Sequence, residues 1–299
     1  MLRTYKESPL NTEILIERLK NRELVISNYS LAEHCLQTNG YHRLSAYFHP
    51  FKVRRNNKSI FRSQTNFEDI WNLYKFDGEL RLLVTDALEK IEITFRTTLS
   101  ETMSLRYGSH WYLESVHFRK QYVYSELIQK IHEICKRNDE LTIKKYYQCY
   151  DHPKFPPSWI IFENLSFGIC TNIFRNLKKI NDKKEICSVF NYHPTAIESW
   201  IESLRYTRNL CAHHSRLWNR WFTICPSMQY LFQEPFNKEH TFYAQAIIIE
   251  RLLKPLLLDM NWKRRLFDLL ERYPKIPVYQ MGFYEIWKLD RFWDNKTRN

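Results

Sequence analysis

The sequence contains little glycine. Five glycines occur among 299 residues, and no two of them lie within 25 residues of each other, whereas average usage would give about 20. Loops that cradle phosphate groups need clustered glycines so that backbone N–H groups can approach the ligand. The Rossmann fingerprint and the P-loop are therefore excluded. Turn-rich barrels and sandwiches are disfavoured because they use glycine at tight turns, and a mainly helical protein is expected.

Paired cysteines are also missing. The seven cysteines are odd in number and form no CxxC pair, so neither a disulfide framework nor a zinc ribbon is encoded. Cys211-x-x-His214 with the later Cys225 could be forced into a zinc site, but reduced and mostly buried thiols are the better interpretation. We expect no metal and no cofactor.

No long apolar run is present. The most apolar stretch, 244–260, is interrupted by Glu250, Arg251, Lys254 and Pro255, and it is too short and too charged to span a bilayer. The N-terminal segment MLRTYKESPL has no apolar signal core. We therefore expect a cytoplasmic protein that does not interact with membranes.

The chain carries an excess of positive charge and many aromatic residues. Lys and Arg number 45 against 33 Asp and Glu, which gives a formal net charge of +12, and aromatics make up 16%. This composition favours a polyanionic partner, because basic side chains release counterions from phosphates and aromatic rings stack on unpaired bases. A generally basic proteome rich in Lys and Asn is the alternative explanation.

Hydrophobic periodicity predicts an all-α fold. A long helix is expected over Phe67–Tyr107, interrupted at Gly78, because apolar residues recur at three- and four-residue steps. Ser30–Glu33 and Thr195–Glu198 have the pattern of capping boxes that open helices, and Asn39-Gly40 has that of a helix stop. Further helices are expected over the following ranges: Lys120–Arg137, Pro157–Lys179, 241–259 and 261–272.

Three segments are distinguished by these patterns. Residues 1–65 form a small N-terminal helical lobe, in which the polar, basic segment Lys52–Arg62 is expected to be an exposed hairpin or loop. Residues 66–225 form the helical core, and residues 226–299 form a C-terminal helical extension with a tryptophan-rich end. The expected architecture is a helical bundle with these two additions.

The segment from Arg205 to His214 carries the candidate chemistry. Arg208 followed by His213 or His214 has the form R-N-x-x-x-H or one residue longer. An imidazole can move protons near pH 7 and a guanidinium can hold charge that grows on a phosphorane, which is what metal-free RNA cleavage needs. The spacing alone is weak evidence, since Arg43 and His49 have it too. Arg43 and His49 could be a rival catalytic pair, but Pro50 and its flanking aromatic residues are better interpreted as packing.

Helical geometry adds context to this motif. At 100° per residue, Arg208 lies about 40° from Leu204, and Glu92 lies about 40° from Leu88, so both charges fall within apolar stripes. A charge there is costly unless it is paired. Glu92 and Arg208 are therefore expected to meet or to open onto a cleft, although a buried ion pair that only fixes helix packing is the alternative. His213 lies about 140° from Arg208 on a straight helix, so a shared site requires the helix to kink or end, or a second subunit.

Several stretches together resemble a known family. They are Asn39-Gly-Tyr-His-Arg-Leu-Ser-Ala-Tyr47, Leu88-Glu-Lys-Ile-Glu92 followed by Arg96, Arg208-Asn209 to His213, and a close of Gly282-Phe, Trp287 and Trp293. Through them the chain, from about residue 10 to 293, resembles the Abi-like (AbiD/AbiF) abortive-infection proteins of the HEPN superfamily. It departs from the family pattern at His42, where a second Tyr is usual, and at Ala46, where Gly is usual.

The resemblance implies a HEPN-type helical bundle that forms a homodimer with a composite site. It implies a metal-independent endoribonuclease that leaves a 2′,3′-cyclic phosphate and acts as a toxin in phage defence, in some members controlled by a structured noncoding antitoxin RNA. Arg208 would stabilise phosphate, His213 would be the acid/base, Asn209 would orient and Glu92 would position Arg208 or the RNA. Which imidazole works, His213 or its neighbour His214, stays open.

Other basic and aromatic residues are candidates for RNA binding, although a solvated basic loop would have the same composition. They are Tyr41, Arg43, Arg54, Arg55, Lys58, Arg205 and His214. Two other functions are compatible with the sequence: a non-catalytic scaffold that binds a specific structured RNA, and a protein-interaction module that senses a phage component.

Overall fold

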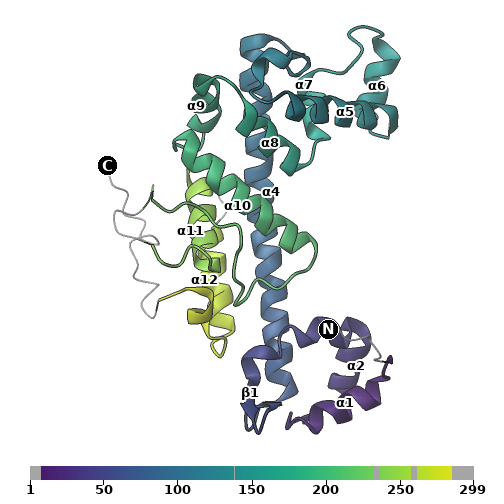
Figure 1. Ribbon diagram of the computed structural model, residues 1–299, viewed down its shortest axis with the longest axis vertical. Coiled ribbons are helices and arrows are strands. Elements are labelled where there is room, and N and C mark those ends of the chain that lie inside the picture. Colours follow the sequence, from purple (N-terminus) through teal and green to yellow (C-terminus); the bar gives the residue numbers. More distant parts are fainter. Residues whose placement is uncertain (1–7, 138, 230, 232–235, 257–260, 285–299) are drawn as a thin grey trace, which may run out of the picture. The chain divides into compact units, whose positions relative to one another are not determined.

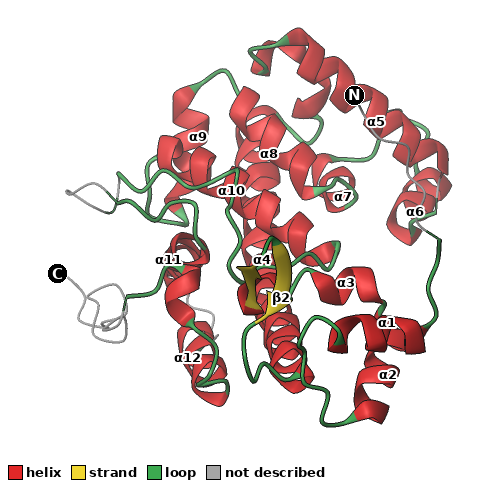
Figure 2. Cartoon of the chain, turned by 60° about the horizontal axis from the view of Figure 1, so that its bottom comes forward, coloured by secondary structure: helices red, strands yellow, loops and turns green. Residues whose placement is uncertain are grey.

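Helices make up nearly all of the described chain. The computed structural model describes residues 8–137, 139–229, 231, 236–256 and 261–284. Within these residues the strands are limited to one antiparallel pair, β1 (Lys52–Arg55) and β2 (Lys58–Phe61), as Figure 2 shows. The all-α expectation is confirmed. The predicted tryptophan-rich close at Trp287 and Trp293 lies outside the described residues.

The chain divides into two compact units. Unit 1 comprises residues 1–80 and 269–276, and unit 2 comprises residues 81–268 and 277–299. The division therefore falls at residue 80, inside a helix, and the segment 269–276 joins the N-terminal unit. The three segments 1–65, 66–225 and 226–299 stay a prediction.

Unit 1 is built from short helices and the hairpin. Asn28 caps the second helix by accepting a hydrogen bond from the N–H of Leu31, and Gly40 with φ of 77° ends it. The expected stop at Asn39-Gly40 is confirmed, but the helix begins before Ser30, so Ser30 is not its cap. The helices of this unit are α1 (Thr12–Lys20), α2 (Tyr29–Asn39) and α3 (Tyr41–Ser45). It also contains the first part of α4 (Phe67–Tyr107) and the last residues of α12 (Trp262–Arg272).

The basic segment 52–62 forms a hairpin, as expected. Arg55 pairs with Lys58 next to the turn and Arg54 pairs with Ser59, and Asn56 and Asn57 adopt positive φ in the turn between them. Asparagine tolerates this left-handed conformation well, which is why Asn-rich two-residue turns close hairpins.

The remaining helices belong mainly to unit 2. The helix α4 (Phe67–Tyr107) continues into this unit from residue 81, and Figure 1 shows it as one long rod. The others are α5 (Gln121–Arg137), α6 (Leu141–Cys149), α7 (Ser158–Glu163), α8 (Phe167–Asn176), α9 (Ile180–Ser188), α10 (Pro194–Ala212), α11 (Phe242–Leu253) and α12 (Trp262–Arg272). None of the described helices has the length and apolar character needed to cross a bilayer.

Two features of this helix pattern correct the expectations. Gly78 does not interrupt α4, because one glycine inside a long helix costs only about 1 kcal/mol relative to alanine, and the helix is continuous. The single helix expected over 157–179 is two helices, since Ser166 caps α8 by accepting from the N–H of Ile169 and starts a new direction there.

The core of unit 2 forms around α4. The predicted stripe is buried, with Val84, Leu88, Ile91, Phe95 and Leu99 all at most 1% exposed. The ring of Phe95 meets the rings of Phe167 and Phe174 edge-on, which seats α8 against α4. This packing fixes the helices from which the candidate site projects.

Candidate functional site

The helix α10 is held firmly along its inner face. Pro194 occupies its first turn and His193 caps it by accepting from the N–H of Thr195, so the helix starts one residue before the capping box expected at Thr195. The buried hydroxyls of Ser203 and Thr207 both donate to the side-chain oxygen of Gln245 on α11. These bonds fix the rotation of α10 and thereby the direction of its outer residues.

Arg208 lies on the outer side of α10 and corrects one expectation. Its side chain is 44% exposed rather than buried within the apolar stripe, because a long side chain can leave an apolar surface and bring its charged end to water. Glu92 on α4 is 12% exposed. Of the two charges that fall on apolar stripes, the carboxylate of Glu92 is therefore the buried one, and the guanidinium of Arg208 reaches it from the surface.

Glu92 links two arginines. Its Oε2 atom lies 3.6 Å from Nε of Arg208, and its Oε1 atom accepts a 2.7 Å hydrogen bond from Arg96 one turn further along α4. Arg96 is 12% exposed and also donates to the carbonyl oxygen of Leu165 at 3.3 Å. The expectation that Glu92 and Arg208 meet is thus confirmed. The arrangement holds Arg208 by charge at one side and leaves the rest of its guanidinium exposed.

The helix ends between Arg208 and the histidines. Ala212 is the last residue of α10, and His213 is its C-cap, with an N–H that bonds to the carbonyl oxygen of Asn209. His214 takes a left-handed conformation with φ of 53°. Both histidines are exposed. The helix therefore ends between Arg208 and His214. A helix end was one of the conditions under which Arg208 and His213 could share a site in spite of the roughly 140° between them on a straight helix.

A second ionic group lies on the same helix, in the two turns before Arg208. Glu202 accepts hydrogen bonds of 3.1 and 2.5 Å from Arg205, and its Oε2 atom lies 3.8 Å from Arg175 on α8. The hydrogen bonds from Arg205 hold the pKa of Glu202 below its usual value in spite of burial, and Arg175 adds to this. Gly168 on α8 faces this group, and the Cδ atom of Arg205 passes 3.4 Å from the place a Cβ would take there.

Beneath these charges lies a buried thiol. Cys170 on α8 is fully buried, and burial raises its pKa to about 12 although Arg96 opposes this shift. A thiol with such a pKa stays protonated near neutral pH and is a poor nucleophile. Cys170 is therefore part of the packing beneath the arginines.

The remaining candidates for RNA binding lie in unit 1. Tyr41 is half-buried with its ring edge-on to Phe48 at 5.7 Å, and Arg43 is exposed. Arg54, Arg55 and Lys58 are all exposed on the hairpin. Six of the candidate residues thus belong to unit 2, where Glu92 and Arg208 are in contact, and the other five belong to unit 1. Those of unit 2 are Glu92, Arg205, Arg208, Asn209, His213 and His214.

Among the described residues, no group of three or more His, Cys, Asp or Glu side chains is arranged to hold a metal ion. Cys225 was one of the three residues, with Cys211 and His214, that could be combined into a zinc site. Its Sγ atom lies 3.9 Å from Nε2 of His240.

The sequence patterns did not identify two residues of the second ionic group, Arg175 and Glu202. Arg175 and Glu202 come from different helices, so no linear spacing connects them. The i to i+3 relation between Glu202 and Arg205 is the one signal that was available.

The comparisons with known proteins gave one match. A family model described as Abi-like protein matches residues 34–219, a range that includes α4, α8 and α10. No curated protein and no solved structure matched the chain.

Proposed function

The chain belongs to the Abi-like protein family, and from that premise we propose that it is a metal-independent endoribonuclease of abortive infection. The observation that carries the proposal is the exposed Arg208, fixed beside Glu92, on a helix that ends four residues later at two exposed histidines. Phage defence is what the family suggests; the nuclease chemistry is our inference from these residues.

The reaction assigned to this site is an internal transfer at phosphorus. The ribose 2′-oxygen attacks the adjacent phosphorus while its proton passes to an imidazole, for which we assign His213. The bond from phosphorus to the 5′-oxygen breaks, and that oxygen takes a proton, giving a 2′,3′-cyclic phosphate and a 5′-hydroxyl. Arg208 neutralises the charge that grows on the phosphorane oxygens, and Asn209 orients the phosphate. Glu92 is a positioning residue, because it acts through Arg208.

We propose that two copies of the chain complete the site. A homodimer brings a second Arg208 and His213 to the same phosphate, so that one imidazole removes the proton and the other supplies one. Light scattering on a gel-filtration column measures the mass in solution, and a monomer that cleaves RNA would contradict this part of the proposal.

The activity is tested with purified protein and total RNA in the presence of EDTA. We expect wild type and Arg264→Ala, a control that removes an exposed arginine from α12, to cleave equally. Arg208→Ala and His213→Ala should each lose at least about a hundredfold in rate. The product ends should resist adenylation at the 3′ side and accept phosphate from a kinase at the 5′ side.

Two results would overturn this assignment. Cleavage that needs a divalent metal would exclude the chemistry, and undiminished cleavage by Arg208→Ala would exclude the site. His214→Ala is measured beside His213→Ala, because a loss restricted to His214→Ala would transfer the acid/base role to that neighbour.

A second candidate function is a scaffold that binds a structured RNA without cutting it. The observation that favours it is the hairpin of unit 1, where Arg54, Arg55 and Lys58 are all exposed. Binding of RNA with no cleavage under any condition would support the scaffold over the nuclease.

A further inference from the structure

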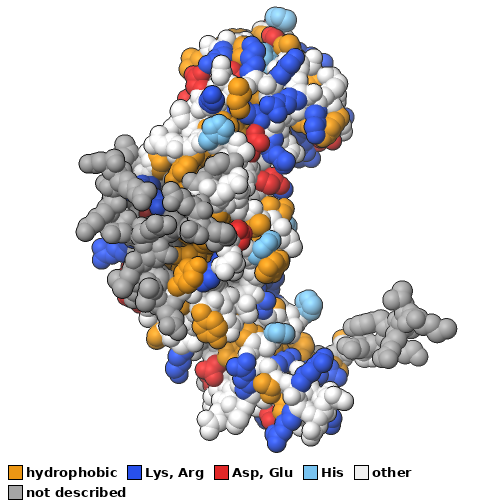
Figure 3. All heavy atoms as spheres, turned by 60° about the vertical axis from the view of Figure 1, so that its left-hand side comes forward, with side chains coloured by type: hydrophobic (Ala, Val, Ile, Leu, Met, Phe, Trp, Pro, Cys, Tyr) orange, Lys and Arg blue, Asp and Glu red, His pale blue; other side chains and the backbone are white. Residues whose placement is uncertain are grey.

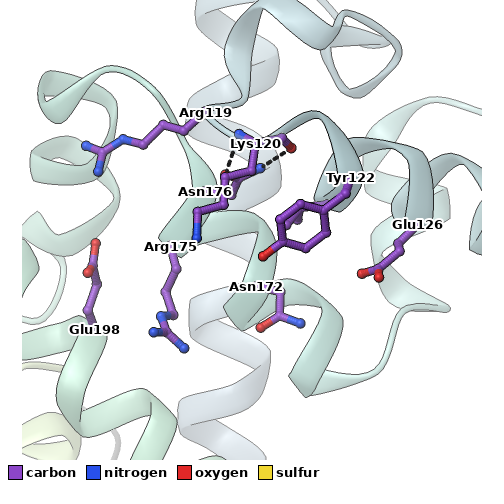
Figure 4. A pocket seen from close by; sticks show the side chains of 9 residues that line it. Arg119, Lys120, Tyr122, Glu126, Asn172, Arg175, Asn176 and Glu198 are labelled. Carbon is purple, nitrogen blue, oxygen red and sulfur yellow. Dashed lines mark hydrogen bonds between the residues drawn. The ribbon is translucent and has the colours of Figure 1, made fainter.

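A polar pocket lies in unit 2, apart from the motif of Arg208 and His213. It has a volume of about 340 Å³ and lies where the start of α5 meets α8 and α10. Figure 4 shows Tyr122 and Asn172 on one side of it and Arg175 on another, with Arg119 and Glu198 at its edge.

The wall of the pocket is fixed by one asparagine. The side chain of Asn176, 4% exposed, accepts from the N–H of Lys120 at 2.9 Å and donates to the carbonyl oxygen of the same residue at 3.2 Å. The backbone oxygen of Asn176 accepts from the N–H of Arg119 at 2.8 Å. The backbone of the two basic residues just before α5 is thus joined to the end of α8, which fixes this wall of the pocket.

The charges in the pocket favour an anion. Three basic residues and two carboxylates line it: Arg119, Lys120 and Arg175, with Glu126 and Glu198. One of these, Glu198, is neutralised by the buried ammonium of Lys183 at 2.5 Å. The contact of Arg175 with Glu202 is 3.8 Å long, too long for a hydrogen bond, so Arg175 keeps N–H donors for a ligand.

The other side of the pocket offers a ring and an amide. Tyr122 is 59% exposed, and the ammonium of Lys120 lies over its ring at 5.8 Å. Asn172 is exposed on α8, one turn before Arg175. An exposed aromatic ring stacks on any unpaired base, and an amide can hydrogen-bond to a base edge. Cations opposite a ring and an amide fit a phosphate joined to a base.

We propose that this pocket binds one nucleotide of a single-stranded RNA, on the strand that reaches Arg208 and His213. Arg119 and Arg175 hold a phosphate, Tyr122 stacks on the base and Asn172 contacts its edge. The inference rests on the proposed ribonuclease function, whose substrate it positions.

A path of charges connects the pocket to the motif. Glu198 and Arg208 are ten residues apart on α10, about 15 Å along the helix axis. Between them Glu202 contacts Arg175 from the pocket and Arg205 from the motif side. Many Lys and Arg side chains also gather at the end of unit 2 where α5 and α6 lie, as Figure 3 shows. A strand that leaves the pocket along α10 meets the guanidinium of Arg205 before that of Arg208.

Binding is measured separately from cleavage with a fluorescein-labelled, 2′-O-methylated RNA ten-mer. This probe has no 2′-hydroxyl to attack phosphorus, so its fluorescence anisotropy reports affinity alone. We expect Arg119→Ala and Arg175→Ala to weaken binding about fivefold or more each, and to lower the slope of log K against log salt by about 0.7 per cation removed. Arg264→Ala is the matched control for loss of one exposed arginine.

The base contact is tested with Tyr122. We expect Tyr122→Ala to weaken binding about fivefold or more and Tyr122→Phe to leave it unchanged, because phenylalanine stacks as tyrosine does. On cleavable RNA, the pocket variants should raise KM and leave kcat close to wild type, whereas Arg208→Ala should lower kcat.

The outcomes separate the pocket from the nuclease. Unchanged affinity in Arg119→Ala and Arg175→Ala overturns the pocket assignment and leaves the nuclease proposal intact. If the pocket variants bind the ten-mer more weakly than wild type but neither wild type nor any variant cleaves RNA, the nuclease proposal and the strand's path toward Arg208 are overturned. Adenosine monophosphate and inorganic phosphate are titrated as competitors of the labelled ten-mer. If either one displaces the ten-mer at a concentration ten times lower than unlabelled RNA does, the pocket binds a free ligand and the proposal of an RNA strand is overturned.

Discussion

Glu92 binds Arg208 with one carboxylate oxygen and Arg96 with the other, and the two arginines differ in exposure. Arg96 is 12% exposed, whereas Arg208 is 44% exposed. Removing the carboxylate therefore has two separate consequences. It removes the hydrogen-bonded ion pair of the guanidinium that is largely out of water, which keeps a 3.8 Å contact with Glu163, and it frees the other guanidinium at the surface.

The first prediction separates stability from function in this group. Glu92→Ala should lower the free energy of unfolding by about 2 kcal/mol, because Arg96 loses its short ion pair and keeps the carbonyl oxygen of Leu165 and a 3.8 Å contact with the exposed Glu163. Arg208→Ala should lower it by less than about 1 kcal/mol, since its partner contact is long and exposed. Urea unfolding followed by circular dichroism measures both. Equal destabilisation by the two variants would mean that Arg208 serves packing.

The second prediction concerns Gly282. Its φ is +94°, and an added Cβ would meet Oγ1 of Thr241 at 2.1 Å, so alanine fits neither the backbone nor the space. Gly282→Ala should therefore lower the free energy of unfolding by more than about 1 kcal/mol. Gly168→Ala is the matched control, because a Cβ there meets Arg205 at an ordinary 3.4 Å. Similar thermal midpoints for the two variants would contradict the prediction.

The third prediction is a pH dependence at Glu202. Hydrogen bonds from Arg205 lower its pKa below the ordinary value of 4.5. A depressed pKa contributes stability that is present above the unfolded pKa and is lost as pH falls through the folded pKa. Wild type should thus exceed Glu202→Gln in stability at pH 7, by less than about 1 kcal/mol after screening, and the difference should vanish on acidification below 4.5. Denaturant titrations at several pH values test this, and a constant difference would contradict it.

The fourth prediction concerns thiol reactivity. Cys149 is exposed, whereas Cys170 and Cys187 are buried and burial raises the pKa of each to about 12. At pH 8 an alkylating reagent should modify Cys149 first, because the thiolate is the reactive form. Mass spectrometry of peptides after timed labelling gives the order. Early labelling of Cys170 in folded protein would show that α8 opens.

The fifth prediction concerns the hairpin of unit 1. Substituting alanine for Arg54, Arg55 and Lys58 should lower the slope of log K against log salt for single-stranded RNA by about 0.7 for each phosphate contact removed. Val53→Ala, also exposed on β1, tests whether the hairpin tolerates substitution without loss of charge. An unchanged slope in the triple variant would leave these residues as a solvated loop.

The long apolar patterns were predictable from the sequence. The stripe of α4 and the inner face of α10 follow from residues spaced three and four apart, since burial of such faces is what stabilises helices in proteins. Short helices such as α6 and α9 were not predicted, because nine-residue helices are formed by tertiary packing more than by local preference. The capping residues Asn28 and His193 each lie two residues before the cap that the sequence predicted, Ser30 and Thr195.

The candidate site was predictable in part. The meeting of Glu92 and Arg208 followed from two charges on apolar stripes, and the structure confirms the contact. The exposure of Arg208 did not follow, since angular position locates the Cβ atom and a guanidinium lies several bonds beyond it. The pocket around Arg119 and Arg175 had no linear signal, because three helices supply it.

The end of α10 at Ala212 changes what the spacing between arginine and histidine means. Inside a helix each added residue would turn the imidazole by about 100°, and only one spacing would point it at a given phosphate. His213 and His214 follow the last turn, and the second of them already has a left-handed backbone. The number of intervening residues therefore sets a maximum reach rather than a direction. The helix fixes the position of the guanidinium. Four to six intervening residues are then the chain lengths that let the imidazole reach the same phosphate.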